Sequence, residues 1–365
     1  MGGEPLVLAV NPGSTSTKLG LFQGDDEVFQ EDLHHPDGEL AAFAGRPVLD
    51  QLELRLEAVR QALGRRRVDT SGLAAVAGRG GLLGSLRSGS YQVTDAMLQE
   101  LRAARRGEHA SNLGAFLAAR LAESAGCLAL VVDPVSVDEW DDVARFSGLA
   151  GLDRQCLSHA LNTKAVAKRY AAESGKPYNR LRLVVVHLGS GTTVSAHRDG
   201  AMVDSTNSRE EGPFSAERTG SLPVMEFARL VLESHWTLAD VERAVFREGG
   251  MYSYLGTRDL RQVLHLVDQG EEGAGLVLSA MLYQVRKEAG AMAAVLDGRV
   301  DALLLTGGMV RAQGVADELK RALHWIAPVV VYPGEDELRA LAEGALRVLR
   351  GEELAHRIEG ARPAS

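Results

Sequence analysis

The sequence predicts an α/β protein built from two related lobes, and three observations carry this prediction. Residues 6–22 form two apolar strand patterns joined by a turn rich in Gly, Ser and Thr. Residues 183–196 repeat that design halfway along the chain, and a third apolar strand within 302–310 runs into a pair of glycines. Strand and helix patterns alternate elsewhere as in α/β layers, and 365 residues are enough for two domains.

The first turn has the composition of an anion-binding loop. Its backbone N–H groups and hydroxyls can face an anion, with Gly13 allowing close approach and Ser14 and Ser16 supplying hydroxyls. Asn11 and Lys18 add an amide and a positive charge. The turn matches neither the Walker pattern nor Gly-x-Gly-x-x-Gly. An ordinary hairpin whose residues only satisfy turn geometry is the alternative interpretation.

The second turn and the glycine pair extend the anion-binding interpretation. We expect the second turn to cradle the β and γ phosphates of a nucleotide with Gly189, Ser190, Gly191 and Thr192. Gly307 and Gly308 offer bare backbone against which a flat ring can lie. Three such elements in this order predict a nucleotide site between two lobes.

Helical periodicity and capping signals define the elements of the first half. An apolar stripe predicts a helix over 48–63, and a short strand follows at 73–77. A Thr-Asp capping signal begins a helix over 94–104, and an Ala-rich helix over 111–126 ends at a glycine. The apolar run 127–132 is a strand with an aspartate at its carboxyl end.

Further helices are predicted over 161–174, 222–233, 237–247, 275–296 and 336–350. A Gly-Lys-Pro sequence marks the approach to the second lobe. We place the first lobe at 1–155 and the second at 156–335, with the C-terminal segment 336–365 packing back on the first. The helix over 275–296 is long enough to bridge lobes or subunits, which predicts a homodimer through the second lobe or a higher homo-oligomer.

Composition indicates a cytoplasmic enzyme. Two cysteines, Cys127 and Cys156, give neither a disulfide framework nor a metal-binding spacing. The net charge of −9 argues against a nucleic-acid surface, and the basic cluster 65–67 is the polar end of a helix. No apolar run approaches the roughly 18 residues of a membrane span, and the first residues lack the basic start of a signal peptide.

Nine motifs in sequence order resemble one superfamily, that of acetate kinases, sugar kinases, heat-shock ATPases and actin. Within it the chain is similar to the butyrate kinases, the short-chain and branched-chain carboxylate branch of the acetate kinase family. The motifs are 11–18, 78–81, 109–114, 133–135, 159–162, 187–191, 217–220, 306–308 and 332–335. The resemblance implies a two-lobed actin-like (ribonuclease H-like) ATPase fold, with ATP or ADP and Mg²⁺ bound in the cleft between the lobes.

Phosphorylation of a carboxylate has physical requirements that two arginines meet. A carboxylic acid with a pKa of about 4 to 5 is already ionised at pH 7, so it needs no general base. Two anions at about 4 Å repel by roughly 4 kcal/mol at an effective dielectric near 20, so cations must lie between them. Arg79 and Arg218 are each flanked by glycine within two residues, which lets a planar guanidinium enter a cleft. The resemblance implies that both stabilise the transferring phosphoryl group.

The resemblance also assigns histidines and the remaining nucleotide contact. His159 matches a histidine that contacts the transferring phosphoryl group, and His187 precedes the second phosphate loop and can orient it. His109 matches a position in the active-site cleft, and Arg258 matches an arginine on the adenosine side. For each of these histidines, a purely structural role is the alternative.

Metal ligands cannot be read from spacing, because the oxygen donors are scattered. The matched candidates are Asn11, Asp133 and an acidic residue after the Pro-Gly pair at 333–334. Three acids follow one another there, so a shift of one residue changes the choice. We prefer Glu335 and keep Glu337 as the alternative.

These motifs predict a kinase that converts ATP and butyrate, or a branched analogue, to ADP and the acyl phosphate. Acetate or propionate kinase is the alternative within enzymes, and a chaperone-like ATP-driven clamp is the alternative outside them. Gly80 and Gly81 replace the bulky apolar residues that follow the first arginine in acetate kinases, which predicts extra room for a four-carbon acid. The alternative is that these glycines serve only the backbone turn.

Overall fold

The computed structural model describes residues 3–358 of the chain. They fall into two compact units. Unit 1 comprises the chain up to Asp138 together with the segment from Asp336, and unit 2 comprises Glu139–Glu335. No helix in the described part of the chain is long and apolar enough to cross a membrane.

The boundary lies before Glu139, whereas the sequence placed it after residue 155. The segment 139–155 belongs to unit 2 because its polar groups are bound there. Trp140 donates its ring N–H to Ser205 Oγ at 3.2 Å. Arg154 forms ion pairs with Asp204 and Glu211. The segment has little regular structure, so no periodic pattern in the sequence reports these contacts.

Unit 1 is built on a mixed sheet with the strand order β3-β2-β1-β4-β6-β5. The strands are β1 (Leu6–Pro12), β2 (Ser16–Gln23), β3 (Asp26–His34), β4 (Leu73–Arg79), β5 (Ser90–Gln92) and β6 (Leu128–Val132). The first three strands form an antiparallel meander, and β1, β4 and β6 are parallel neighbours. This order places the carboxyl ends of β1, β4 and β6 along one edge of the sheet.

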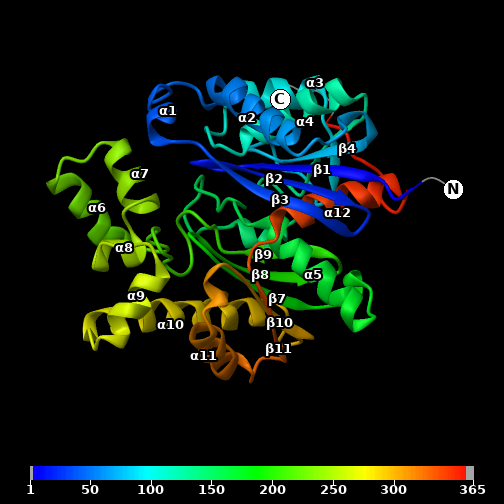
Figure 1. The fold of residues 1–365 in the computed structure, drawn as a ribbon. Coiled ribbons are helices and arrows are strands. Elements are labelled where there is room, and N and C mark those ends of the chain that lie inside the picture. Colours follow the sequence, from blue (N-terminus) through cyan, green and yellow to red (C-terminus); the bar gives the residue numbers. More distant parts are fainter. Residues whose placement is uncertain (1–2, 359–365) are drawn as a thin grey trace. The chain divides into compact units, whose positions relative to one another are not determined.

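Helices cover both faces of the unit 1 sheet (Figure 1). They are α1 (Asp37–Ala41), α2 (Leu52–Arg65), α3 (Asp95–Ala103), α4 (Asn112–Ala125) and α12 (Glu337–Leu349). α4 packs on β1, β4 and β6 from one side, with α2 and α3 beside it, and the C-terminal helix α12 packs on the same three strands from the other. α12 therefore belongs to unit 1, although the whole of unit 2 lies between it and β6 in the sequence.

Unit 2 is built on a second sheet with the order β11-β10-β7-β8-β9. Its strands are β7 (Leu183–Leu188), β8 (Thr192–Arg198), β9 (Ala201–Ser205), β10 (Ala302–Gly307) and β11 (Val329–Pro333). An antiparallel meander of β7, β8 and β9 is again followed by parallel neighbours, β10 and β11. Apart from the extra edge strand β5 in unit 1, the two sheets share one topology, which confirms the prediction of two related α/β lobes.

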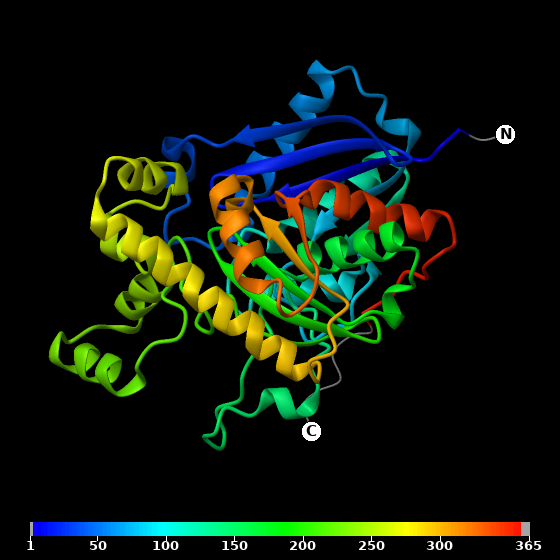
Figure 2. The same cartoon turned by 90° about the horizontal axis from the view of Figure 1, so that it is seen from below.

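The helices of unit 2 are α5 (Ala160–Ser174), α6 (Val224–Glu233), α7 (Leu238–Phe246), α8 (Gly250–Leu255), α9 (Leu260–Asp268), α10 (Glu272–Val295) and α11 (Gln313–Leu323). α10, the long yellow helix in Figure 2, packs with α11 on the sheet face that presents Val184, Val186 and Leu305. α5 packs on the face that presents Val185 and Leu304. Residues along most of α10 are buried in the core of this unit, so the length of this helix alone does not require a partner subunit. The homodimer stays a prediction.

Local sequence signals fix the element ends where caps are present. Thr94 and Thr237 cap α3 and α7 with their hydroxyls, as their position before each helix predicts. α4 ends at Gly126, which adopts φ of +69°. The predictions from the sequence did not name α1, α8, α9, α11, β3, β5, β9 or β11, although α9 and α11 carry amphipathic patterns. All of the missed elements lie within the two predicted lobes.

Candidate functional site

Three predicted residues meet at the carboxyl edge of the unit 1 sheet. Asn11 lies at the end of β1, Arg79 ends β4, and Asp133 directly follows β6. Because these strands are parallel neighbours, their carboxyl ends adjoin, and this edge is where open α/β sheets bind ligands. We call Asn11, Arg79, Asp133 and Glu337 the first-unit cluster.

Glu337, the first residue of α12, joins Asn11 and Arg79. Its carboxylate accepts hydrogen bonds from Asn11 Nδ2 and from Arg79 Nη1, and its side chain is 8% exposed. The sequence left the choice among three acids open and preferred Glu335. The structure brings Glu337 to Asn11, because Asp336 adopts φ of +39° and turns the chain directly into α12. Glu335 belongs to unit 2.

Two polar atoms of the first-unit cluster are buried without a hydrogen-bond partner in the structure. They are Asn11 Oδ1 and Arg79 Nε. Leaving a buried polar atom unpaired costs about 1 to 3 kcal/mol, so such atoms mark positions where water, an ion or a ligand can complete the hydrogen bonding. An acceptor oxygen beside a carboxylate suits a hard cation, and a free guanidinium N–H suits an anion.

The turn at 88–89 holds the side chain of Asp133 through hydrogen bonds. Its Oδ1 accepts hydrogen bonds from Ser88 Oγ at 2.6 Å and from Gly89 N at 2.7 Å, and the residue itself adopts φ of +37°. Within residues 3–358, no group of three or more His, Cys, Asp or Glu side chains is arranged to hold a metal. Mg²⁺ takes only one or two protein carboxylates together with waters and phosphate oxygens, so the donor set of Asn11 and Glu337 fits this ion.

The turn between β1 and β2 closes as a tight hairpin. Gly13 N donates to Ser16 O at 2.8 Å, and Asn11 lies opposite Lys18 in the ladder. A Cβ built on Gly13 would approach only Ser16 O, at an ordinary 3.5 Å. Neither backbone conformation nor packing therefore demands glycine here, and its role in letting a ligand approach stays a prediction. Ser14 and Lys18 are exposed.

The expected extra room beside Gly80 and Gly81 is absent, so this part of the prediction is wrong. A Cβ on Gly80 would lie 2.3 Å from Pro134 Cβ, and one on Gly81 would lie 2.3 Å from Asn112 Oδ1. These glycines serve close packing of the chain at the end of β4. His109 is exposed, and its Nδ1 lies 2.8 Å from Ser111 Oγ just before α4. Its role in the cleft stays a prediction.

A second group of predicted residues meets at the carboxyl edge of the unit 2 sheet. The loop 189–191 follows β7, the glycine pair ends β10, and Glu335 follows β11. These three strands are also parallel neighbours. We call His159, His187, the loop 189–191, Arg218 and Glu335 the second-unit cluster.

Two histidines of the second-unit cluster stack on each other. The rings of His159 and His187 lie 4.0 Å apart with 14° between their planes. Asn162 donates Nδ2 to Glu335 O at 2.7 Å, so its Oδ1 faces His187 Nδ1, also at 2.7 Å. His187 Nδ1 therefore donates, and its Nε2 lies 3.7 Å from Glu335 Oε1. His159 is fixed through Nδ1, 2.8 Å from Thr193 Oγ1.

Arg218 packs against the loop 189–191. Its Nη1 donates to Ser208 O at 2.7 Å, and a Cβ on Gly191 would lie 2.6 Å from that nitrogen and 3.2 Å from His159 Cε1. Arg218 forms no ion pair in the described part of the chain. Burial lowers the pKa of the Arg218 guanidinium, attraction to the Glu217 carboxylate opposes this shift and repulsion from Arg209 adds to it, and the residue remains a cation at neutral pH.

The loop itself is held by Ser215, which donates Oγ to Ser190 O and accepts the backbone N–H of Arg218. Thr192 lies at the start of β8, 3% exposed, and its Oγ1 has no hydrogen-bond partner in the structure. This is the third buried side-chain atom left unpaired among the described residues. All three belong to residues that the sequence assigned to the site.

The two glycines of the pair differ in how closely other atoms pack against them. Gly307 adopts φ of +98°, and a Cβ there would lie 2.2 Å from Leu188 O. Gly308 has nothing within 4 Å of its Cβ position. Arg258 instead pairs with Glu217 at 3.2 Å and stacks over Tyr252, so its place beside adenosine stays a prediction.

This difference predicts opposite effects of two alanine substitutions. Gly307→Ala should lower the melting temperature, because it forces a strained conformation and a clash with Leu188. Gly308→Ala should leave the melting temperature unchanged but raise the dissociation constant for ADP by about tenfold, because the added methyl keeps a flat ring off the backbone. Thermal melts and calorimetric titration measure both. Equal ADP affinity in wild type and Gly308→Ala would contradict the assignment of the pair to adenosine.

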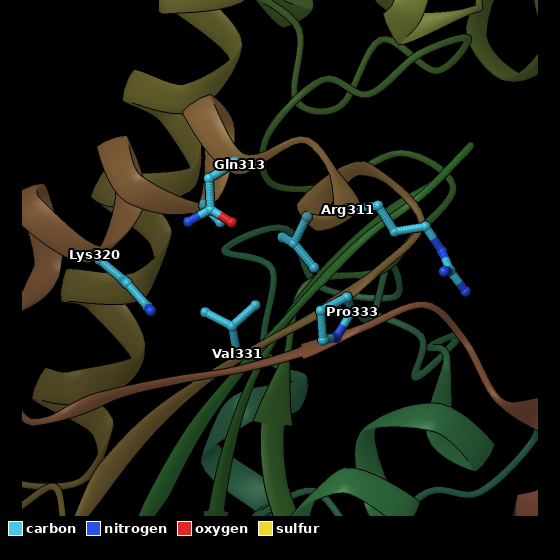
Figure 3. A pocket seen from close by; sticks show the side chains of 7 residues that line it. Arg311, Gln313, Lys320, Val331 and Pro333 are labelled. Carbon is cyan, nitrogen blue, oxygen red and sulfur yellow. The ribbon is translucent and has the colours of Figure 1, made fainter.

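A cavity of about 300 Å³ lies between α11 and the edge strand β11 (Figure 3). Gln313 and Lys320 extend from α11 over Val331, and Arg311 also lines the cavity. The cavity begins two residues after Gly308, at Val310. It contains no residue that the sequence assigned to the site.

Sequence reasoning missed two residues that organise these clusters. Asn162 lies within the motif 159–162, but nothing in a single sequence showed that it joins His187 to Glu335. Arg55 lies in an amphipathic stripe that predicts core packing, but it binds the carbonyls of Ser14 and Ser16. Its signal was a lone arginine beside the apolar positions of α2.

Known proteins resemble this chain in sequence and in fold. The model of the acetokinase family matches residues 152–326. Two curated relatives from Clostridium botulinum, strains Eklund 17B and Alaska E43, each called "probable butyrate kinase", are 43% identical over 350 residues, covering 96% of this chain and 98% of theirs.

Solved structures share the fold at low identity. The acetate kinase of Porphyromonas gingivalis superposes with a TM-score of 0.78 at 19% identity, covering 94% of this chain and all of that one. A propionate kinase from Francisella tularensis gives a TM-score of 0.73 at 16% identity, covering 93% of this chain and 98% of that one. The fold is the two-lobed actin-like ATPase fold that the sequence predicted. With two curated relatives matched almost end to end, the chain belongs to the acetokinase family.

Proposed function

We propose that this chain transfers the γ-phosphoryl group of ATP to the carboxylate of a short-chain fatty acid, with butyrate or a branched analogue as the preferred acid. One observation carries the proposal. The buried polar atoms left unpaired in the described residues are Asn11 Oδ1, Arg79 Nε and Thr192 Oγ1, and all of them lie at predicted phosphoryl-transfer positions. The curated relatives called probable butyrate kinase support the choice of acid.

The reaction needs positioning and charge neutralisation, and the chain supplies both. A carboxylate oxygen of the acid attacks the γ-phosphorus in line, the bond from phosphorus to the β–γ bridging oxygen breaks, and ADP leaves with that electron pair. No proton has to be removed from the acid. The observations supporting roles for Arg79 and Arg218 are an unpaired Nε in the first and the absence of an ion pair in the second among the described residues. Both can stabilise charge on the moving group.

Other residues of the clusters would hold the reactants rather than react. His159, fixed by Thr193 next to Arg218 and Gly191, can donate to a phosphoryl oxygen. Asn11 and Glu337 would hold Mg²⁺, with Asp133 as a further candidate. When bound, this ion neutralises phosphate charge and orients the β and γ oxygens. A cytoplasmic location and a homodimer or larger homo-oligomer complete the proposal.

Trapping the product across a series of acids tests this function. Hydroxylamine converts an acyl phosphate to a hydroxamate, so product can be measured with straight and branched acids of two to six carbons. Each buried methylene contributes about 0.8 kcal/mol, so a pocket that encloses two more than acetate offers should give about tenfold higher kcat/KM for butyrate. Preference for acetate or propionate would assign the alternative activity. ATP consumption that is independent of any acid would instead favour an ATP-driven clamp.

A further inference from the structure

Arg55 is a fully buried arginine that the proposed chemistry does not use. It lies on α2 with 0% of its surface exposed, behind the turn that joins β1 and β2. Its Nη2 donates to Ser14 O at 3.2 Å, and its Nη1 donates to Ser16 O at 3.0 Å and to Thr17 Oγ1 at 3.1 Å. One guanidinium thus binds three polar residues of the first phosphate turn, Ser14, Ser16 and Thr17.

The charge of Arg55 has no acidic partner in the described part of the chain. Its remaining contact is Gln51 Oε1, at 2.9 Å from Nη2, and that group is neutral. Burial lowers the pKa of Arg55 to about 10, so the group is still a cation at neutral pH. A buried charge without a counter-ion is costly, and ordinary folds pair it. Its retention behind an anion-binding turn indicates that the counter-ion is a ligand.

The contacts of Arg55 also set the direction in which the turn presents its backbone. The carbonyls of Ser14 and Ser16 accept from the guanidinium, and Thr15 O accepts from His35 N at 2.8 Å. His35 further contacts Thr17 Oγ1 through Nε2 at 2.9 Å. All three carbonyls are thus used by the protein. The N–H groups of Ser14 and Thr15 have no protein partner in the residues described, and they remain available to an anion.

We propose that Arg55 is a positioning residue that holds the 13–17 turn in its anion-binding form and supplies the buried positive charge that a nucleotide's terminal phosphate balances. This inference rests on the proposed function insofar as it assigns the turn to ATP. It does not depend on which acid accepts the phosphoryl group. Arg55 acts through the turn, because its hydrogen-bonding nitrogens are occupied by Ser14, Ser16, Thr17 and Gln51.

Ligand binding without any acid tests the proposal. The dissociation constants of a non-hydrolysable ATP analogue and of adenosine are measured by calorimetry, with circular dichroism and thermal melts reporting the fold. Arg55→Met should raise the dissociation constant of the analogue by about tenfold or more, because the turn loses its hydrogen bonds from Arg55 and the bound phosphate loses a nearby positive charge. Adenosine, which carries no phosphate, should bind within about twofold of wild type. Arg60→Met, an exposed arginine of the same helix, is the matched control and should change neither constant.

Arg55→Lys provides a second variant in case the methionine variant does not fold. It keeps the charge but cannot bind two carbonyls in a fork, so the analogue should weaken by about threefold and adenosine should not. Equal weakening of analogue and adenosine, or unchanged analogue binding in either folded variant, would overturn the proposal. A wild type that binds the analogue but forms no acyl phosphate would refute the proposed function alone.

Discussion

Arg79→Ala should lower kcat for acyl phosphate formation by roughly a thousandfold or more, the range lost when an arginine that stabilises a transferring phosphoryl group is removed. The guanidinium ends β4, is held by Glu337 through Nη1, and keeps Nε unpaired in a buried position. Truncation removes that cation and also removes the ion pair of Glu337, which keeps its hydrogen bond from Asn11. ATP affinity should change much less, because the charge of Arg79 serves the moving group rather than the nucleotide.

Steady-state kinetics and titration with a non-hydrolysable ATP analogue separate these two quantities. Arg79→Lys should recover part of the rate, because it restores the charge but not the planar fork. Arg87→Ala, an exposed arginine of the same unit, is the control and should match the wild type. Turnover within about fivefold of wild type in Arg79→Ala would show that the cation is not at the reacting group.

Glu337→Gln should lower kcat/KM by about a hundredfold, or roughly 2.7 kcal/mol, and raise the Mg²⁺ concentration needed for half-maximal rate. The carboxylate accepts from both Asn11 and Arg79, so its loss removes a metal ligand and loosens both neighbours. Glu335→Gln is the matched control two residues away. Its carboxylate faces His187 at 3.7 Å in the other unit, so the same change there should cost less than about tenfold.

Initial rates over a Mg²⁺ titration measure this difference. Glu337→Gln should raise the Mg²⁺ concentration at half-maximal rate, whereas Glu335→Gln should leave that concentration unchanged. The reverse order would return the metal to Glu335, as the sequence alone preferred. Equal shifts of the Mg²⁺ titration in the two variants would contradict the assignment of the metal to Glu337 rather than Glu335.

The sequence predicted those parts of the site that depend on local order. The hairpin turn at 13–17 and the strand ends at Asn11, Arg79 and Asp133 are set by adjacent residues and by the parallel pairing of β1, β4 and β6. Helix ends with a capping hydroxyl or a left-handed glycine, such as Thr94 and Gly126, could also be predicted from the sequence.

What the sequence could not predict depends on contacts between distant positions. Glu337 meets Arg79 across 258 residues of chain, and only the backbone turn at Asp336 decides which of three acids does so. Arg55 meets Ser14 across 41 residues, and no local pattern reports that contact. The absence of room at Gly81 was equally invisible, because Asn112 fills that space.

The central claim is that a carboxylate oxygen of the acid becomes bonded to phosphorus. Butyrate labelled with heavy oxygen in its carboxylate, incubated with ATP and the enzyme, tests this directly. Hydroxylamine attacks the carbonyl carbon of the acyl phosphate and releases the phosphate together with the bridging oxygen. The account predicts that this phosphate carries one heavy oxygen, seen as an isotope shift by phosphorus NMR. Phosphate free of the label, formed while ATP is consumed in the presence of butyrate, would show that water rather than the acid accepts the phosphoryl group.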